Sequence, residues 1–126
     1  MRIEERDGLL FVSVTLSHKG ITQLVDDVIL DTGAAQSLID MTAVEPMDIA
    51  AEGQDDFVFM SGIGGQEVAL RKRIDFVQFG DYVIENAHVD FAYLDTHPGI
   101  NGLLGADILL SGRFIIDLDE MALYQR

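Results

Sequence analysis

Cysteine and tryptophan are absent from this chain of 126 residues, and proline occurs only twice. A chain without cysteine has no disulfide, no thiol nucleophile and no thiolate ligand for a metal ion, which fits a reducing compartment. No stretch approaches the roughly 20 apolar residues that cross a bilayer. Residues 1–7 have the wrong charge for a signal peptide and contain no apolar core. We therefore expect a soluble protein without membrane insertion, located in the cytoplasm.

Basic residues are also scarce, since 8 Lys and Arg stand against 22 Asp and Glu, giving a formal net charge of -14. Nucleic acids and anionic membranes bind clusters of Lys and Arg, so the charge argues against both as main partners. The one basic run, residues 71–73, is interpreted as the exposed end of a strand. With 48% hydrophobic residues, the length is sufficient for one core, and we expect a single domain over residues 1–126.

Long helical periodicity is missing too, whereas short runs rich in Val, Ile, Leu and Phe alternate with Gly, Asp or Asn turns. This pattern predicts an all-β, mainly antiparallel fold in which repeated hairpins close into a barrel. The expected hairpins pair residues 9–16 with 21–30, 57–60 with 67–70, 74–79 with 82–91, and 114–118 with 121–125. A helical turn capped by Asp40 and stopped by Pro46 is also expected. One short C-terminal helix, residues 106–111, is expected between Gly105 and Gly112.

The strongest chemical signal is Asp31, which follows the apolar residues 28–30 directly. A carboxylate at the end of a buried strand must protonate or find a partner, and two facing carboxylates can share one proton. In the motif that follows, Thr32 supplies a hydroxyl, Gly33 permits close backbone approach and Ala34 leaves room beside the carboxylates. By itself, however, Asp-Thr-Gly is more typical of a turn than of a catalytic site.

Other candidate centres are weaker. His18, His88 and His97 lack the spacing of metal ligands, and each is interpreted as a surface or turn residue. A serine nucleophile elbow is absent from the sequence. Asp95 and Thr96 repeat the start of the Asp31 motif without its glycine and are predicted to lie in a loop. We therefore expect neither a metal nor another cofactor.

Three separated segments resemble the retropepsin-like, or retroviral-type, aspartic proteases, over about residues 21–125. The first segment, residues 28–39, contains Asp31 and resembles the active-site strand and loop of that family. The second resembles the glycine-rich flap that closes over a bound peptide, and consists of Met60, Ser61, Gly62, Ile63, Gly64 and Gly65. The third resembles the apolar segment that crosses behind the catalytic loop and enters a helix, with Leu103, Leu104 and Gly105 as supporting core.

The resemblance implies a catalytic role for Asp31, with Thr32 bonded across a dimer and Gly33 and Ala34 against the substrate backbone. Residues 60–65 would form the flap, although such a glycine-rich tip is also typical of a mobile hairpin or a weak phosphate-binding nest. Taken alone, residues 103 and 104 indicate only a buried strand.

The implied function is that of an aspartic endopeptidase. Because the sequence has one Asp-Thr-Gly, the active form would be a homodimer in which two Asp31 carboxylates activate water against a peptide or protein substrate. The alternative is a catalytically inactive dimeric peptide-binding or scaffold module of the same fold. Asp107 stands where viral enzymes often carry arginine and resembles the cellular and bacterial members, and the tail after the last helix also departs from the viral pattern. Ile63, Val89 and Leu103 are candidates for the apolar lining of a substrate pocket.

Overall fold

The computed structural model of the chain describes residues 1–62, 65–94 and 97–126. Within these ranges the chain is mainly β, as predicted, with only two short helices, η1 (Thr42–Met47) and α1 (Ala106–Ser111). The strands are β1 (Glu4–Arg6), β2 (Leu9–His18), β3 (Ile21–Leu30), β4 (Leu38–Asp40), β5 (Asp56–Gly62), β6 (Gly65–Arg73), β7 (Phe76–Phe79), β8 (Tyr82–Glu85), β9 (His88–Ala92), β10 (Gly102–Leu104), β11 (Ile115–Asp117) and β12 (Ala122–Tyr124).

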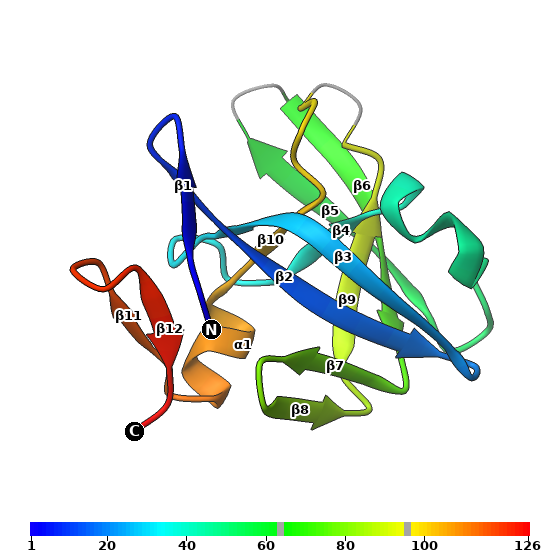
Figure 1. Ribbon diagram of the computed structural model, residues 1–126. Helices are drawn as coiled ribbons and strands as arrows, with labels where there is room; N and C mark the ends of the chain where they lie inside the picture. The colour runs from blue at the N-terminus through cyan, green and yellow to red at the C-terminus, as the bar shows by residue number, and fades with distance from the viewer. Residues whose placement is uncertain (63–64, 95–96) are drawn as a thin grey trace.

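One large mixed sheet has the strand order β5-β6-β9-β4-β10-β3-β2-β7-β8, and β1 pairs with β2 (Figure 1). Most neighbours are antiparallel, but β10 runs parallel to β3 and β4 runs parallel to β9. The predicted closure into a barrel is not confirmed. In the part of the chain that the structure describes, β5 and β8 are the outer strands of two hairpins, and each pairs with one neighbour only, so the sheet stays open.

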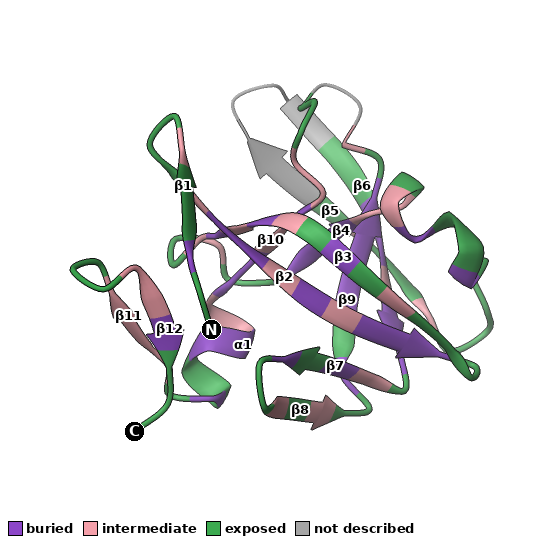
Figure 2. Cartoon of the chain, viewed as in Figure 1, coloured by how far each residue is buried: buried purple, intermediate pink, exposed green. Residues whose placement is uncertain are grey.

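The long β2–β3 hairpin forms where the alternation of apolar residues predicts it. Its turn lies at Lys19 and Gly20, and the φ of +82° at Gly20 is one that glycine adopts without steric cost. Along the two strands, Val14, Val25 and Val28 point into the main core and are almost completely buried (Figure 2). The hairpin thereby delivers residue 31 at the end of a strand that is anchored in the core.

Three predicted boundaries are wrong, one in a strand and two in the helical turn. Residues 82–91 were expected as one strand, but Asn86 adopts a φ of 53°, which breaks the run into β8 and β9. As a result, β9 leaves the hairpin and pairs with β6 and β4. Pro46 lies inside η1 rather than ending it, and the turn is preceded by Met41 instead of Asp40.

The last hairpin, β11–β12, forms as predicted and packs against the N-terminal segment, which lies beside it in Figure 1. Arg2 bridges to Ala122, and the amide of Leu123 donates to the carbonyl of Met1 at 2.7 Å. Ile3 and Leu123 are both buried in the main core. Each of the two described helices has six residues, so neither has the length to cross a membrane.

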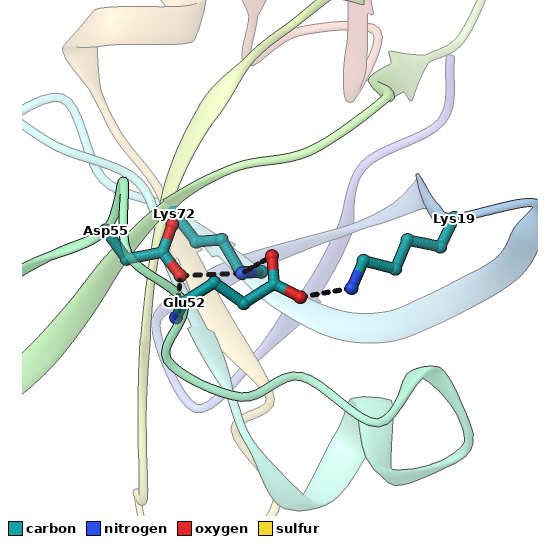
Figure 3. A network of polar contacts seen from close by, with 4 residues as sticks. All are labelled: Lys19, Glu52, Asp55 and Lys72. Atoms are coloured by element: carbon teal, nitrogen blue, oxygen red, sulfur yellow. Dashed lines mark hydrogen bonds and ion pairs between the residues drawn. The ribbon is translucent and has the colours of Figure 1, made fainter.

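The prediction that residues 71–73 form an exposed strand end is wrong for Lys72. Strand alternation turns this side chain inward, and only 2% of it is exposed. Its ammonium donates to Asp55 at 2.6 Å and to Glu52 at 3.2 Å (Figure 3). Glu52 also pairs with Lys19 at the β2–β3 turn. This base network, formed by Lys19, Glu52, Asp55 and Lys72, ties β6 and the loop before β5 to the central hairpin.

In the base network, hydrogen bonds and nearby opposite charges together affect the pKa values more than burial does. The hydrogen bond from Lys19, followed by the bond from Lys72, lowers the pKa of Glu52. Burial alone would raise the pKa of Asp55, but the hydrogen bonds from Lys72 and the Glu52 amide lower it. Burial would likewise lower the pKa of Lys72, but its bonds to Asp55 and Glu52 raise that pKa instead. All three groups are therefore held in their charged forms.

His18 also departs from its predicted surface position. It ends β2 opposite Ile21 and is buried, with 8% of the residue exposed. Both ring nitrogens lack a hydrogen-bond partner among the residues described. His88, by contrast, is exposed and accepts a bond from Arg73, and His97 is exposed after the segment 95–96, which lies outside the described residues.

Candidate active site

Asp31 is held at the point where β3 leaves the sheet. Its amide donates to the carbonyl of Leu104 at 3.0 Å, which extends the parallel β3–β10 ladder by one residue beyond Leu30. Since β3 lies between β2 and β10, strands on both sides fix the backbone that leads into Asp31. The central strands β2, β3 and β10 therefore fix the backbone position of Asp31.

The residues after Asp31 form a tight turn, which agrees with the turn-forming tendency of the motif. The amide of Ala34 donates to the carbonyl of Asp31 at 3.1 Å, and the amide of Gly33 donates to Asp31 Oδ1 at 3.0 Å. A Cβ on Gly33 would stand 3.3 Å from that oxygen, so a larger residue would crowd the carboxylate. Thr32 and Gly33 face solvent, and Ala34 is half-buried.

Asp31 itself is only half-buried. The expectation of a carboxylate enclosed at the end of a buried strand is thus wrong for the single chain, because the apolar environment ends at Leu30, which is 9% exposed. We refer to Asp31 and the loop of residues 32–37 together as the half-site, because the sequence contains one Asp-Thr-Gly.

The third predicted segment lies behind this loop, as the resemblance implied. Leu104 and Gly105 are buried, and Leu103 is half-buried against a small cluster around Leu38. The carbonyl of Ala34 accepts a bond of 2.7 Å from Ala106, the first residue of α1. A Cβ on Gly105 would lie 2.7 Å from that carbonyl oxygen, so the close contact between loop and helix needs glycine.

Two side chains not predicted as site residues join the loop to the helix. The hydroxyl of Ser37 donates to Asp107 Oδ1 at 2.7 Å, and the amide of Ser37 donates to Asp107 Oδ2 at 3.0 Å. The same hydroxyl accepts a bond of 2.9 Å from the amide of Gly105. The only signals in the sequence are a small polar residue shortly after Asp31 and an acidic residue in the first turn of a helix.

An ion pair between a half-buried arginine and a buried aspartate borders the half-site. Arg71 on β6 makes two bonds to Asp90 on β9, at 2.8 and 3.1 Å, and these bonds raise the pKa of Arg71. The amide of Asp90 donates to the carbonyl of Ser37 at 3.2 Å. The strand that descends from the glycine-rich hairpin is in this way connected to the end of the Asp31 loop.

The β5–β6 hairpin forms at the predicted place and projects at the upper edge of Figure 1. Its ladder continues to the pair Gly62 and Gly65, so the backbone of Met60, Ser61, Gly62 and Gly65 belongs to the two strands. Ile63 and Gly64, the centre of the predicted flap, lie outside the described residues. Of the predicted pocket-lining residues, Val89 is 2% exposed and belongs to the main core, so it cannot contact substrate.

Among residues 1–62, 65–94 and 97–126, no group of three or more His, Asp or Glu side chains is placed to hold a metal ion. The half-site contains the Asp31 carboxylate, backbone amides and the hydroxyls of Thr32 and Ser37. These groups can exchange protons and position water or a peptide.

Comparison with known families agrees with this arrangement. The model of a family described as aspartyl protease matches residues 14–108 of the 126. The match begins in β2 and ends in α1, so it contains the Asp31 loop, the β5–β6 hairpin and β10. A comparison with curated proteins finds no match. On the strength of the family match, this chain belongs to the aspartyl protease family.

Proposed function

We propose that the chain is an aspartic endopeptidase that works as a homodimer with Asp31 as its catalytic residue. The observation that carries the proposal is the half-site, in which a half-exposed Asp31 is clamped between the end of β3 and the β10–α1 connection. The sequence contains only one Asp-Thr-Gly, so the second carboxylate has to come from another copy.

In the proposed dimer, the two Asp31 carboxylates share one proton, the pattern of aspartic proteases. The ionised carboxylate accepts a proton from water while the protonated one donates to the carbonyl oxygen of the peptide. The water oxygen bonds to the carbonyl carbon and gives a tetrahedral diol. The C–N bond then breaks as the nitrogen takes a proton. The roles proposed for Thr32, Gly33 and Ala34 are to support this centre across the dimer and along the substrate backbone.

Residues 60–65 are proposed as the flap that covers the substrate, supported by the β5–β6 ladder up to Gly62 and Gly65. Such a cover excludes water and orients the peptide. The C-terminal hairpin β11–β12 supports a relation to the cellular and bacterial members. Because this hairpin is bonded to Met1 and Ile3 of its own chain, we infer a dimer contact different from an interleaved terminal sheet. A single domain over residues 1–126 and a cytoplasmic location remain proposals.

The test is a peptide-library cleavage assay with the purified full chain from acidic to neutral pH. We expect wild type to cleave and Asp31→Asn to lose cleavage, at least 1,000-fold, with an unchanged circular dichroism spectrum. Asp48→Asn is the matched control, because Asp48 is exposed and has a φ of 51°, which asparagine tolerates. Cleavage by Asp31→Asn at the wild-type rate would refute the proposal. Peptide binding without cleavage by wild type would support the inactive peptide-binding module instead.

A further inference from the structure

The hydroxyl of Ser37 both donates and accepts a hydrogen bond. It donates to Asp107 at 2.7 Å and accepts from the amide of Gly105 at 2.9 Å, so the direction of its single proton is fixed. The residue is 2% exposed, which leaves almost no access for water to replace either bond. Loss of this hydroxyl would leave the buried amide of Gly105 without its acceptor.

Asp107 uses both carboxylate oxygens in the same contact. Oδ1 accepts from the Ser37 hydroxyl and from the amide of Ile108 at 2.9 Å, while Oδ2 accepts from the amide of Ser37 at 3.0 Å. Bonds to a charged acceptor are the stronger kind, and a two-oxygen contact also fixes orientation. The carboxylate therefore locks a loop residue onto the first turn of α1.

The bonds lie at the far end of the loop that starts at Asp31. At its near end, the amide of Asp31 is bonded to Leu104, and in its middle the carbonyl of Ala34 is bonded to Ala106. Thus β10 and α1 hold the loop at its beginning, middle and end. The Ser37 hydroxyl and the Asp107 carboxylate are bonded to each other and to the backbone amides of Ser37, Gly105 and Ile108.

We propose that Ser37 and Asp107 are positioning residues of the active site, whose bonds hold the Asp31 loop in the geometry needed for hydrolysis. The proposal rests on the endopeptidase function proposed above. It predicts an effect on turnover rather than on substrate binding, because the carboxylate position matters for the reaction more than for holding the peptide.

The test compares kcat and KM of the full chain as wild type, Ser37→Ala, Ser37→Thr and Asp107→Asn. We expect Ser37→Ala to lower kcat about 10- to 100-fold with KM changed less than about twofold. Asp107→Asn keeps the shape of the side chain but replaces one accepting oxygen by an NH2 group. This group cannot accept a hydrogen bond, so at least one of the bonds that Asp107 accepts is lost and kcat should fall too. Ser37→Thr keeps the hydroxyl and should recover most of the lost kcat.

Ser111→Ala is the matched control, since it removes an exposed hydroxyl that lies on the same helix and bonds to Tyr82. Its kcat should equal that of wild type. The proposal is overturned when Ser37→Ala retains wild-type kcat, or when its loss of activity only follows the fraction of unfolded protein measured by circular dichroism.

Amide hydrogen exchange separates this proposal from the endopeptidase function. In Ser37→Ala the amides of Ala34, Gly105 and Ala106 should exchange at least tenfold faster, while those in the β2–β3 hairpin stay unchanged. If the wild-type chain cleaves no peptide, the proposed endopeptidase function is refuted. The exchange rates of these three amides then test by themselves whether Ser37 holds the loop. Unchanged exchange at all three would refute that holding role.

Discussion

At the scale of single residues, the half-site depends on the absence of a side chain at Gly105. A Cβ there would stand 2.7 Å from the carbonyl oxygen of Ala34 and 3.0 Å from the backbone of Gln36. Both neighbours are backbone atoms that already have fixed positions, so neither can turn away as a flexible side chain would. The contact of the Asp31 loop with α1 therefore requires glycine at this position.

Gly105→Ala should destabilise the chain by about 1–3 kcal/mol, the usual range for an overpacked site. The added methyl must push the loop away from α1, so peptide cleavage should fall as well. Urea denaturation followed by circular dichroism measures the first effect, and the cleavage assay measures the second.

Gly53→Ala is the control for that substitution, because a Cβ at Gly53 meets no atom within 4 Å and its φ is not in the positive range. This variant should be as stable as wild type or slightly more so. A Gly105→Ala variant with the stability and activity of the Gly53→Ala control would show that the loop adapts freely.

The residue scale also shows where prediction from sequence ends. Asp31 could be selected as the candidate catalytic residue because its motif, its preceding apolar strand and its distance from two other segments all resemble one family. The bond between Ser37 and Asp107 could not, since the two residues are 70 positions apart and each is an ordinary polar residue in its local sequence. The half-burial of Asp31 could not be predicted either, because it depends on which loops surround the strand end.

At the scale of elements, the base of the β5–β6 hairpin is tied to the body by the base network. Lys72 lies on β6, Glu52 and Asp55 precede β5, and Lys19 lies in the β2–β3 turn (Figure 3). The side chain of Asp55 is 7% exposed, so its charge depends on Lys72 for compensation. Removal of one partner from a buried pair costs more than the pair itself contributes.

Lys72→Met should therefore lower the free energy of unfolding by about 3 kcal/mol, measured by urea denaturation near neutral pH. Lys19→Met is the control, because that side chain is 64% exposed and water can solvate the carboxylate it leaves. The control should change stability much less. Equal effects of the two substitutions would mean that burial of Lys72 is unimportant.

The pH dependence of this difference follows from the pKa directions. Glu52 and Asp55 have lowered pKa values, so their stabilisation is present above their ordinary values of 4.5 and 3.8 and is lost as the pH falls below them. Lys72 has a raised pKa, so its stabilisation is lost only as the pH rises above its ordinary value of 10.5. The difference in the free energy of unfolding between wild type and Lys72→Met should thus be largest from about pH 5 to pH 10 and should decrease below about pH 4.

Strand prediction succeeded where partners are close in sequence. The alternation of apolar and polar residues, together with the turn residues, predicts the β2–β3, β5–β6 and β11–β12 hairpins. The strands of each hairpin pair antiparallel, as expected. Lys72 was misplaced because the carboxylates that permit its burial lie 17 and 20 residues away, outside any local pattern. The family resemblance implied that residues 103–105 cross behind the Asp31 loop, but the pairing of β10 with β3 was not predicted, since parallel pairing has no local signal.

At the scale of the whole molecule, the proposed enzyme is complete only when two half-sites meet. A chain with an intact fold and a defective Asp31 should still associate with wild type, because the substitution leaves the backbone of the half-site in place. Such a hybrid would contain one aspartate and one asparagine and would be inactive.

Addition of Asp31→Asn to wild type should accordingly inhibit cleavage. Random pairing at equal amounts leaves about half of the wild-type chains in active dimers, and a threefold excess leaves about a quarter. The measurement is the initial rate at constant wild-type concentration after subunit exchange, with an unrelated inert protein as the control. A rate unaffected by the variant would show that hybrids do not form or that single chains act alone.

The open sheet marks the limit of prediction at this scale. Composition and strand spacing indicate an all-β chain, but they carry no information on whether the outer strands β5 and β8 meet. Closure depends on the twist and stagger of the complete sheet, which arise from many small contributions.

The insertion of β10 between β3 and β4 has a consequence for biosynthesis. Residues 102–104 supply the partner for both strands, although they leave the ribosome about 70 residues after β3. A nascent chain that stops before Gly102 has no acceptor for the amide of Asp31 and no α1 to support its loop. If the half-site is proteolytic, translation itself delays that activity until residues 102–111, which contain β10 and α1, have been made, and this delay limits damage to neighbouring proteins during synthesis.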